Sequence, residues 1–272
     1  MKTIILRKKK PIFNLDLKNF SSINHISKSL KNISQIKLLM NRREIKLGEI
    51  FSIEILKNKN VDDDIKIFGC NESCYNLGKN WQKDKVFVYS DLGSNIGSKM
   101  ISGEIKVNGS VHDFLGAEMS GGLIYITGNA GNKAGGPYLG KKTGMTGGEI
   151  VIEGNAGDFI GLLMRRGLII VKGSTGDFCC LKMIAGNVIL FKEPRNNFGI
   201  SMKRGSLILL KKKKLVIKDY FKKSGSIESS YLNFLKKYLK EKFFINLNNM
   251  KFIRYYGDRN LDGIGEVLVN DN

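Results

Sequence analysis

The chain has 272 residues, which suffices for one large domain with appendages or at most two domains. Hydrophobic residues make up 42% of it, but no apolar run approaches the roughly 20 residues of a membrane-spanning helix. The charges at the start, Met1 to Lys10, follow a very short apolar stretch, the reverse of a secretory signal peptide. We therefore expect a cytoplasmic protein with no membrane partner.

The net charge of +20 raises nucleic acid as a partner, but its distribution argues against one. Residues 61–210 are nearly neutral, with 17 Lys and Arg against 14 Asp and Glu. The basic flanks are rich in Lys, Ile and Asn, and this composition explains the charge as well as nucleic-acid binding would. The distribution of charge therefore disfavours nucleic acid as a partner, and nucleic-acid binding is kept only as an alternative function.

The four cysteines, Cys70, Cys74, Cys179 and Cys180, do not have the spacing of a structural zinc site. The Cys70 and Cys74 pair could bind metal or oxidise, but buried thiols in a reducing compartment are the favoured interpretation. Cys179 and Cys180 fall inside a repeat, where core filling is expected.

The first 64 residues are expected to form a small α/β unit. Phe13, Leu15 and Leu17 alternate as in a strand, a short helix is predicted near Ser21–Lys31, and apolar residues return over Leu47–Ile53.

A repeat organises the middle of the chain. Glycines recur in steps of 19 residues, with a single step of 26, at Gly103, Gly122, Gly148, Gly167, Gly186 and Gly205. Methionines keep the same steps at Met100, Met119, Met145, Met164, Met183 and Met202. A fixed period of this length is typical of a solenoid.

Each repeat carries a short alternating apolar pair, such as Ile105 and Val107, bounded by glycines. The rest of each repeat has room for turns and a second short strand, but not for a helix. We therefore predict an all-β fold: a right-handed parallel β-helix over residues 65–217, with Gly-x-x-Met coils of about 19 residues stacked about 4.8 Å apart. Trp81, 19 residues before Met100, indicates that the stack starts at least one coil earlier, near Ile65.

The glycines and methionines of the repeat are predicted to be structural. Glycine permits sharp corners with positive φ, and the flexible Met side chain fills a narrow interior. The structural or interface candidates among them are Gly103, Gly122, Gly148, Gly167, Gly186, Met100, Met119, Met145, Met164 and Met183.

A polar row also follows the repeat, at Asp113, Asn132, Asp158, Asp177 and Asn196. Asp and Asn at a repeated turn bond their own backbone, and this is the favoured interpretation. The alternative makes Asp158 and Asp177 the acid and base of a polysaccharide-cleaving β-helix.

The step of 26 places seven extra residues within Gly135–Gly144. In a solenoid such an insertion becomes a loop on one face, often a contact site. Pro137 and Lys141 in the loop, with Arg165 and Arg166 in the next coil, are the interface candidates. The segment lacks the spacing of a phosphate-binding P-loop.

Residues 218–272 are predicted to form a C-terminal helix and cap. Apolar residues at helical spacing mark an amphipathic helix, at Tyr231, Phe234, Leu235, Tyr238 and Leu239. Residues 1–64 and 218–272 are then small α/β caps over the open ends of the stack, which would otherwise expose unpaired edges.

With these residues, the chain resembles the third subunit of formylmethanofuran dehydrogenase and of its bacterial counterpart, the formyltransferase/hydrolase complex. The resemblance is strongest in three stretches, GGPYLGKKTGMTGGEIVIEGNAGDFIGLLMRRG, LGEIF and YGDRNLDGIGEVL. The Gly-x-x-Met repeat is shared with the C-terminal β-helix domain of glutamate synthase. The departures are the high lysine content and Cys179-Cys180-Leu181, where a coil would carry its glycine.

The resemblance implies a scaffold subunit in methanofuran- and tetrahydromethanopterin-linked one-carbon metabolism, without an active site of its own. It implies amidohydrolase-like and formyltransferase-like partner subunits. Zinc and, in a dehydrogenase, molybdenum or tungsten pterin and iron–sulfur clusters would lie on those partners. His25 and His112 are too few for a binuclear metal centre. Whether the complex is a dehydrogenase or a formate-releasing hydrolase depends on the partners.

Overall fold

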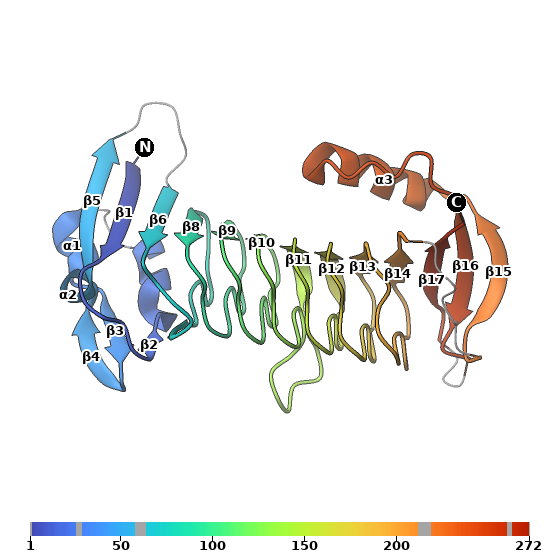
Figure 1. Ribbon diagram of the computed structural model, residues 1–272, viewed down its shortest axis with the longest axis horizontal. Coiled ribbons are helices and arrows are strands. Elements are labelled where there is room, and N and C mark those ends of the chain that lie inside the picture. Colours follow the sequence, from blue (N-terminus) through green and yellow to red (C-terminus); the bar gives the residue numbers. More distant parts are fainter. Residues whose placement is uncertain (1, 26–28, 58–63, 212–218, 260–262, 272) are drawn as a thin grey trace.

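A computed structural model describes residues 2–25, 29–57, 64–211, 219–259 and 263–271. The chain is mainly strand, and thirteen of the described strands form one sheet (Figure 1). The strands in the middle of this sheet are successive in sequence and parallel: β6 (Asp64–Phe68), β8 (Lys85–Tyr89), β9 (Glu104–Val107), β10 (Leu123–Ile126), β11 (Thr146–Ile152), β12 (Arg166–Val171), β13 (Asn187–Leu190) and β14 (Ser206–Leu209).

The register of these strands repeats the predicted period. Ile105 pairs with Ile124, 19 residues on, and Ile124 pairs with Ile150 across the step of 26. Val86 pairs with Ile105, and Ile65 with Val86, so the stack includes the earlier coils expected from Trp81. The inward side chains of each strand are buried, as the alternation predicts.

The expected second strand of each coil is reduced to one bridging residue. Leu92, Val111, Ala130, Ala156, Thr175 and Pro194 form a row of parallel bridges from coil to coil. The rest of each coil is turns, so the backbone pairs mostly between coils rather than within them.

Both ends of the chain add strands to the same sheet, which the sequence patterns did not indicate. The first strand, β1 (Lys2–Lys8), pairs in parallel with β6, and the last, β17 (Gly265–Asn270), pairs in parallel with β14. Antiparallel strands then close the two edges: β5 (Phe51–Lys57) on β1, and β16 (Phe252–Gly257) with β15 (Lys222–Ile227) on β17. The physical reason is that an unpaired strand edge leaves its N–H and C=O groups without partners.

The remaining N-terminal elements pack beside the first coils. A four-stranded sheet contains β2 (Leu15–Asp16), β3 (Lys37–Met40), β4 (Arg43–Lys46) and β7 (Cys74–Tyr75). In place of one helix near Ser21–Lys31, the described residues form a 3₁₀ helix, Lys18–His25, and α1 (Leu30–Ser34), while residues 26–28 lie outside the described part. A further short helix, α2 (Leu47–Ile50), precedes β5 within the apolar segment Leu47–Ile53.

The predicted C-terminal helix is α3 (Ser230–Phe243), and the Ser229 side chain accepts a hydrogen bond from the Leu232 N–H at its start. It lies across the outward side of β11 to β14 (Figure 1). No helix within the described residues is long and apolar enough to cross a membrane. The predicted end of the stack at residue 217 lies outside the described residues.

Candidate functional site

The glycines of the repeat form corners that no other residue could occupy without strain. Gly103, Gly122 and Gly148 have φ of +87°, +86° and +83°. A Cβ built on Gly148 would lie 2.9 Å from the Gly121 carbonyl carbon and 2.5 Å from Met119 Cε. Positive φ and the closeness of the preceding coil therefore both require glycine.

The methionines fill the space that these glycines leave. A Cβ on Gly122 would meet Met100 Cε at 2.6 Å, and the same relation holds for Met145 with Gly167, Met164 with Gly186 and Met183 with Gly205. Every methionine of the row is fully buried. The Met row and the glycine row are thus one packing unit, each Met lying under the corner of the next coil.

The polar row bonds between coils rather than within its own turn. Oδ1 of Asp113 accepts from the Asn132 N–H at 2.7 Å, Asn132 Oδ1 from the Asp158 N–H at 2.8 Å, and Asp158 Oδ1 from the Asp177 N–H at 2.7 Å. The side-chain oxygens accept from backbone N–H groups, as the favoured structural interpretation expects, but the donor lies in the next coil rather than in the residue's own turn. Asp158 and Asp177 are therefore joined in a ladder.

A second polar ladder was not recognised from the sequence. It runs through Asp91, Ser110, Asn129, Asn155 and Ser174, each accepting from the backbone N–H of the next member. Its signal was available, since these polar residues keep the same steps of 19 and 26.

The coil that lacks its glycine keeps the same backbone. Cys180 has φ of +60°, close to the +59° of Gly116 and the +69° of Gly161 at equivalent positions. Both Cys179 and Cys180 are fully buried with free thiols, and burial raises the pKa of Cys180 well above its ordinary value. The other two cysteines, Cys70 and Cys74, are also buried and free.

The insertion projects from the stack as a loop (Figure 1). Pro137 is buried at its base, and Lys141 is exposed. At the other side of the base, Thr146 pairs with Arg166, so the exposed Arg165 and Arg166 lie beside the loop as expected.

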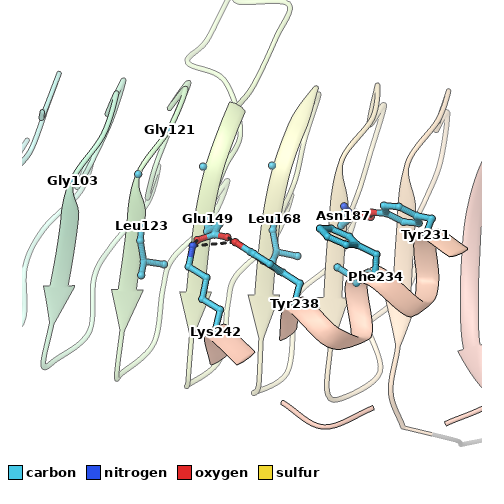
Figure 2. A pocket seen from close by; sticks show the side chains of 14 residues that line it. Gly103, Gly121, Leu123, Glu149, Leu168, Asn187, Tyr231, Phe234, Tyr238 and Lys242 are labelled. Carbon is cyan, nitrogen blue, oxygen red and sulfur yellow. Dashed lines mark hydrogen bonds and ion pairs between the residues drawn. The ribbon is translucent and has the colours of Figure 1, made fainter. Parts of the chain in front are cut away.

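A groove of about 550 Å³ lies between α3 and the outward side of the sheet (Figure 2). Its sheet wall contains Leu123, Glu149 and Leu168 together with glycines of the repeat, Gly103, Gly122, Gly148 and Gly167. Its helix wall contains the side chains of Tyr231, Phe234, Leu235, Tyr238 and Lys242.

The helix is turned relative to its predicted face. Leu232, Leu235 and Leu239 are buried on the sheet, whereas Tyr231 and Phe234 are 48% and 65% exposed. The apolar pattern identified the helix correctly but placed the aromatic edge in the core. That edge instead lines the groove, while the leucines pack on the aliphatic residues of the sheet.

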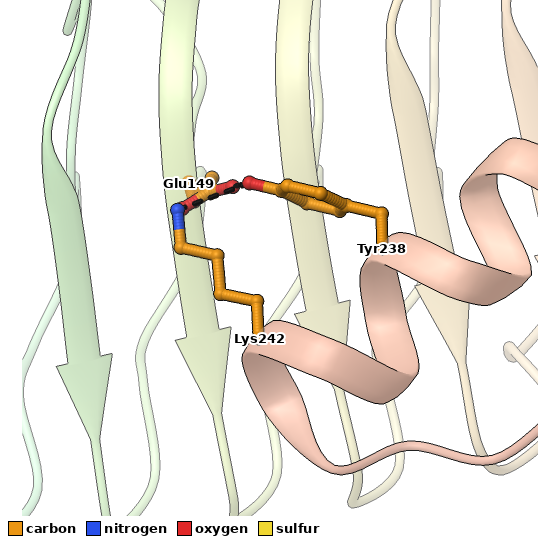
Figure 3. A network of polar contacts seen from close by, with 3 residues as sticks. All are labelled: Glu149, Tyr238 and Lys242. Atoms are coloured by element: carbon orange, nitrogen blue, oxygen red, sulfur yellow. Dashed lines mark hydrogen bonds and ion pairs between the residues drawn. The ribbon is translucent and has the colours of Figure 1, made fainter.

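One polar network links the helix to the sheet (Figure 3). The Tyr238 hydroxyl donates to Glu149, and Lys242 Nζ lies 2.5 Å from Glu149 Oε2 and 3.0 Å from the Tyr238 oxygen. Burial and the Glu149 carboxylate raise the pKa of Tyr238. Burial lowers the pKa of Lys242, but the bonds to Glu149 and Tyr238 outweigh it and leave that pKa raised. The charges of Glu149 and Lys242 therefore balance each other within the groove.

Metal-binding donors are not gathered in the described part of the chain. No three His, Cys, Asp or Glu side chains lie close enough together there to hold a metal ion. His112 is exposed, with Nε2 3.7 Å from Glu72 Oε2.

Comparison with known proteins identifies the class. Residues 82–245 match the model of the GXGXG motif family, so the chain belongs to that family.

Among solved structures, the chain is similar to a chain of the crystal structure of the formyltransferase/hydrolase complex (FhcABCD) from Methylorubrum extorquens in complex with methylofuran. The two are 28% identical with a TM-score of 0.83, over 98% of this chain and 100% of the other. No curated protein matches. The resemblance found in the repeat and its flanks is confirmed by these matches.

Proposed function

We propose that this chain is the third subunit of a formyltransferase/hydrolase or formylmethanofuran dehydrogenase-type complex, in which it acts as a non-catalytic scaffold. The observation that carries this proposal is the similarity over the whole chain to a component of the FhcABCD complex. A match that includes the insertion and both terminal segments is more specific than the glycine repeat alone.

The proposed architecture is a right-handed parallel β-helix over residues 65–217, with caps over residues 1–64 and 218–272. It is supported by the parallel strands with a step of 19 and by the second row of bridges. A stack of this kind is elongated and stiff, because each coil is bonded to its neighbours. Such a body can hold other subunits at fixed distances.

The partners we propose are amidohydrolase-like and formyltransferase-like subunits, with zinc and any molybdenum or tungsten pterin and iron–sulfur clusters on them. The described residues of this chain offer no donor cluster for such groups. The four free cysteines support a reducing compartment, and we propose the cytoplasm.

The polysaccharide-cleaving alternative is weakened by the polar ladder. An acid and base must be free to meet a substrate, but Asp158 Oδ1 is occupied by the Asp177 backbone N–H at 2.7 Å. No specific observation favours this function over the scaffold.

Affinity purification of the full chain from its native host, at moderate salt, tests the proposal. We expect amidohydrolase-like and formyltransferase-like proteins among those that co-elute, identified by mass spectrometry. Metal analysis of the same fraction distinguishes the two complexes, because molybdenum or tungsten would indicate a dehydrogenase. Recovery of the chain alone, or with nucleic acid, would overturn the scaffold function.

A loop variant tests the interface candidates Pro137 and Lys141, both of which it removes. Deletion of residues 137–143 restores the 19-residue step, so the coil can close between Gly136 and Gly144. We expect the variant to fold but to recover less of at least one partner. The matched control is Lys222→Ala with Lys223→Ala, an exposed pair on β15 far from the loop.

A further inference from the structure

The outward side of the sheet has two halves. They differ in whether a helix lies over them and in the type of side chain that they present. Under α3, the middle outward position of successive strands is aliphatic and buried, at Val151, Ile170, Ile189 and Ile208. The same position in the preceding strands is occupied by Lys66, Phe87, Lys106 and Tyr125, all half-buried. In the described part of the chain no helix lies over β6 to β10 (Figure 1). We call the outward side chains of β1, β6, β8, β9 and β10 the open face.

Aromatic rings and cations alternate across the open face. Phe68 stacks on Tyr89 with centroids 4.6 Å apart, and the Arg7 guanidinium lies 4.6 Å from the centre of the Phe68 ring. Lys106 Nζ lies 5.2 Å from the centre of the Tyr125 ring. Arginine and aromatic residues gathered in this way are typical of the energetic centre of protein interfaces.

The charge of the open face is unbalanced. Among the described residues no ion pair involves Lys66 or Lys106, although both are partly withdrawn from water. Under α3, in contrast, the strand carboxylate Glu149 is met by Lys242. A partner that completes the open face should bring carboxylates to its lysines, as α3 brings a lysine to Glu149.

We propose that the open face binds an amphipathic, carboxylate-bearing helix of a partner protein, lying across β6 to β10 in line with α3. Leu123, at the end of the groove beside α3, makes the two halves continuous. This inference rests on the proposed function, because the partner is taken to be another member of the same complex.

A nucleic acid would also meet cations and aromatic rings, but the geometry disfavours it. Bases stack on free ring faces. Here one face of Phe68 and one of Tyr89 face each other, and Arg7 and Lys106 lie over Phe68 and Tyr125.

Charge reversal tests the proposal in the intact complex. We would compare Lys66→Glu with Lys106→Glu, as a double variant, with Lys222→Glu and Lys223→Glu, which change the net charge equally on β15. Each would be purified from the native host by the same affinity tag, and the recovered partners quantified by mass spectrometry. We expect at least a tenfold loss of one partner from the open-face variant and no loss from the control. Lys66→Gln with Lys106→Gln, which keeps side-chain size, should give an intermediate loss if charge is the cause.

The outcomes separate the two proposals. If the wild-type chain recovers no partner, the proposed function fails. If it does and the folded open-face variants recover every partner as well as the control, the open-face inference fails while the scaffold stands. A photo-crosslinking residue in place of Phe87 should capture a helical segment with Asp or Glu from the lost partner. Crosslinking to nucleic acid instead would overturn the inference.

Discussion

Glycine at the coil corners is required for two separable reasons, conformation and space. Gly148 has φ of +83° and backbone atoms of the preceding coil within 2.9 Å of a built Cβ. Gly140, in the inserted loop, has φ of +79° but nothing within 4 Å. The two glycines therefore share a left-handed backbone conformation, but only Gly140 has free room around the position of a Cβ.

Alanine at these two positions should separate the costs. Gly140→Ala should lower the free energy of unfolding by about 1 kcal/mol, the cost of a left-handed residue with Cβ. Gly148→Ala should lower it by about 3 kcal/mol or more, because the new Cβ also displaces the preceding coil. Urea unfolding of both variants measures the difference. Equal losses would show that the close approach of the coils is unimportant.

The polar ladder should need an acceptor but not a charge. Asp158→Ala removes the oxygen that accepts the Asp177 N–H, and we expect a loss of about 1 to 3 kcal/mol in the free energy of unfolding. Asp158→Asn keeps an oxygen in place, as Asn132 does in the preceding coil, and should cost much less. Thermal unfolding of the two variants is the measurement. Equal destabilisation by Asn would instead show that the carboxylate charge matters.

The stability of the folded chain should depend on pH through Tyr125, an outward residue of β10, and the direction of this dependence can be derived. Burial, followed by the hydrogen bond and charge of Glu153, raises the pKa of Tyr125 to about 12. The folded state thus favours the neutral phenol, so its stabilising contribution is present below about pH 10 and is lost as pH rises to about 12. Ultraviolet difference titration of wild type against Tyr125→Phe should show this group titrating last. In Glu153→Gln its pKa should fall, and an unchanged pKa would exclude the carboxylate as a cause.

At the scale of elements, α3 is held by its leucines rather than by its aromatic edge. Leu239 is fully buried on the sheet, whereas Phe234 is 65% exposed. The outward aliphatic residues of β11 to β14 need this cover, because they would otherwise form a large apolar surface in water.

Truncation of two residues on α3 should therefore give different results. Leu239→Ala should lower the free energy of unfolding by about 2 to 5 kcal/mol, through lost burial and the cavity left behind. Phe234→Ala should change it by less than about 0.5 kcal/mol. Thermal unfolding and limited proteolysis of α3 measure both. A large cost at Phe234 would mean that the aromatic edge packs on the sheet after all.

At the scale of the whole molecule, the stack is built from interchangeable units. Each middle strand pairs only with the strands before and after it, in the same register. The stability of such an array is close to a sum over units and their contacts. The length of the molecule is therefore set by the number of coils.

Removal of one complete coil should be tolerated. Deletion of residues 104–122 joins Gly103 to Leu123, and β8 can then pair with β10 in the register that β9 held. We expect a folded chain with the circular dichroism of a β protein and cooperative thermal unfolding. Deletion of residues 104–113 removes half a coil and should abolish the native fold. If both deletions unfold the chain, the coils are not equivalent units.

The sequence by itself determined the repeat: the positions of the glycine corners, the buried methionines and the inward strand pairs. It could do so because every coil meets the same environment, so the same requirement recurs in steps of 19 and is visible in one chain. The tertiary structure alone decided what joins residues far apart. It placed β1 and β17 in the same sheet, turned the aromatic edge of α3 toward the groove, and set Lys66 and Lys106 among aromatic rings on the open face. Each of these contacts occurs once in the molecule, so it leaves no periodic pattern in the sequence. Each also depends on which surfaces remain uncovered after the coils have stacked.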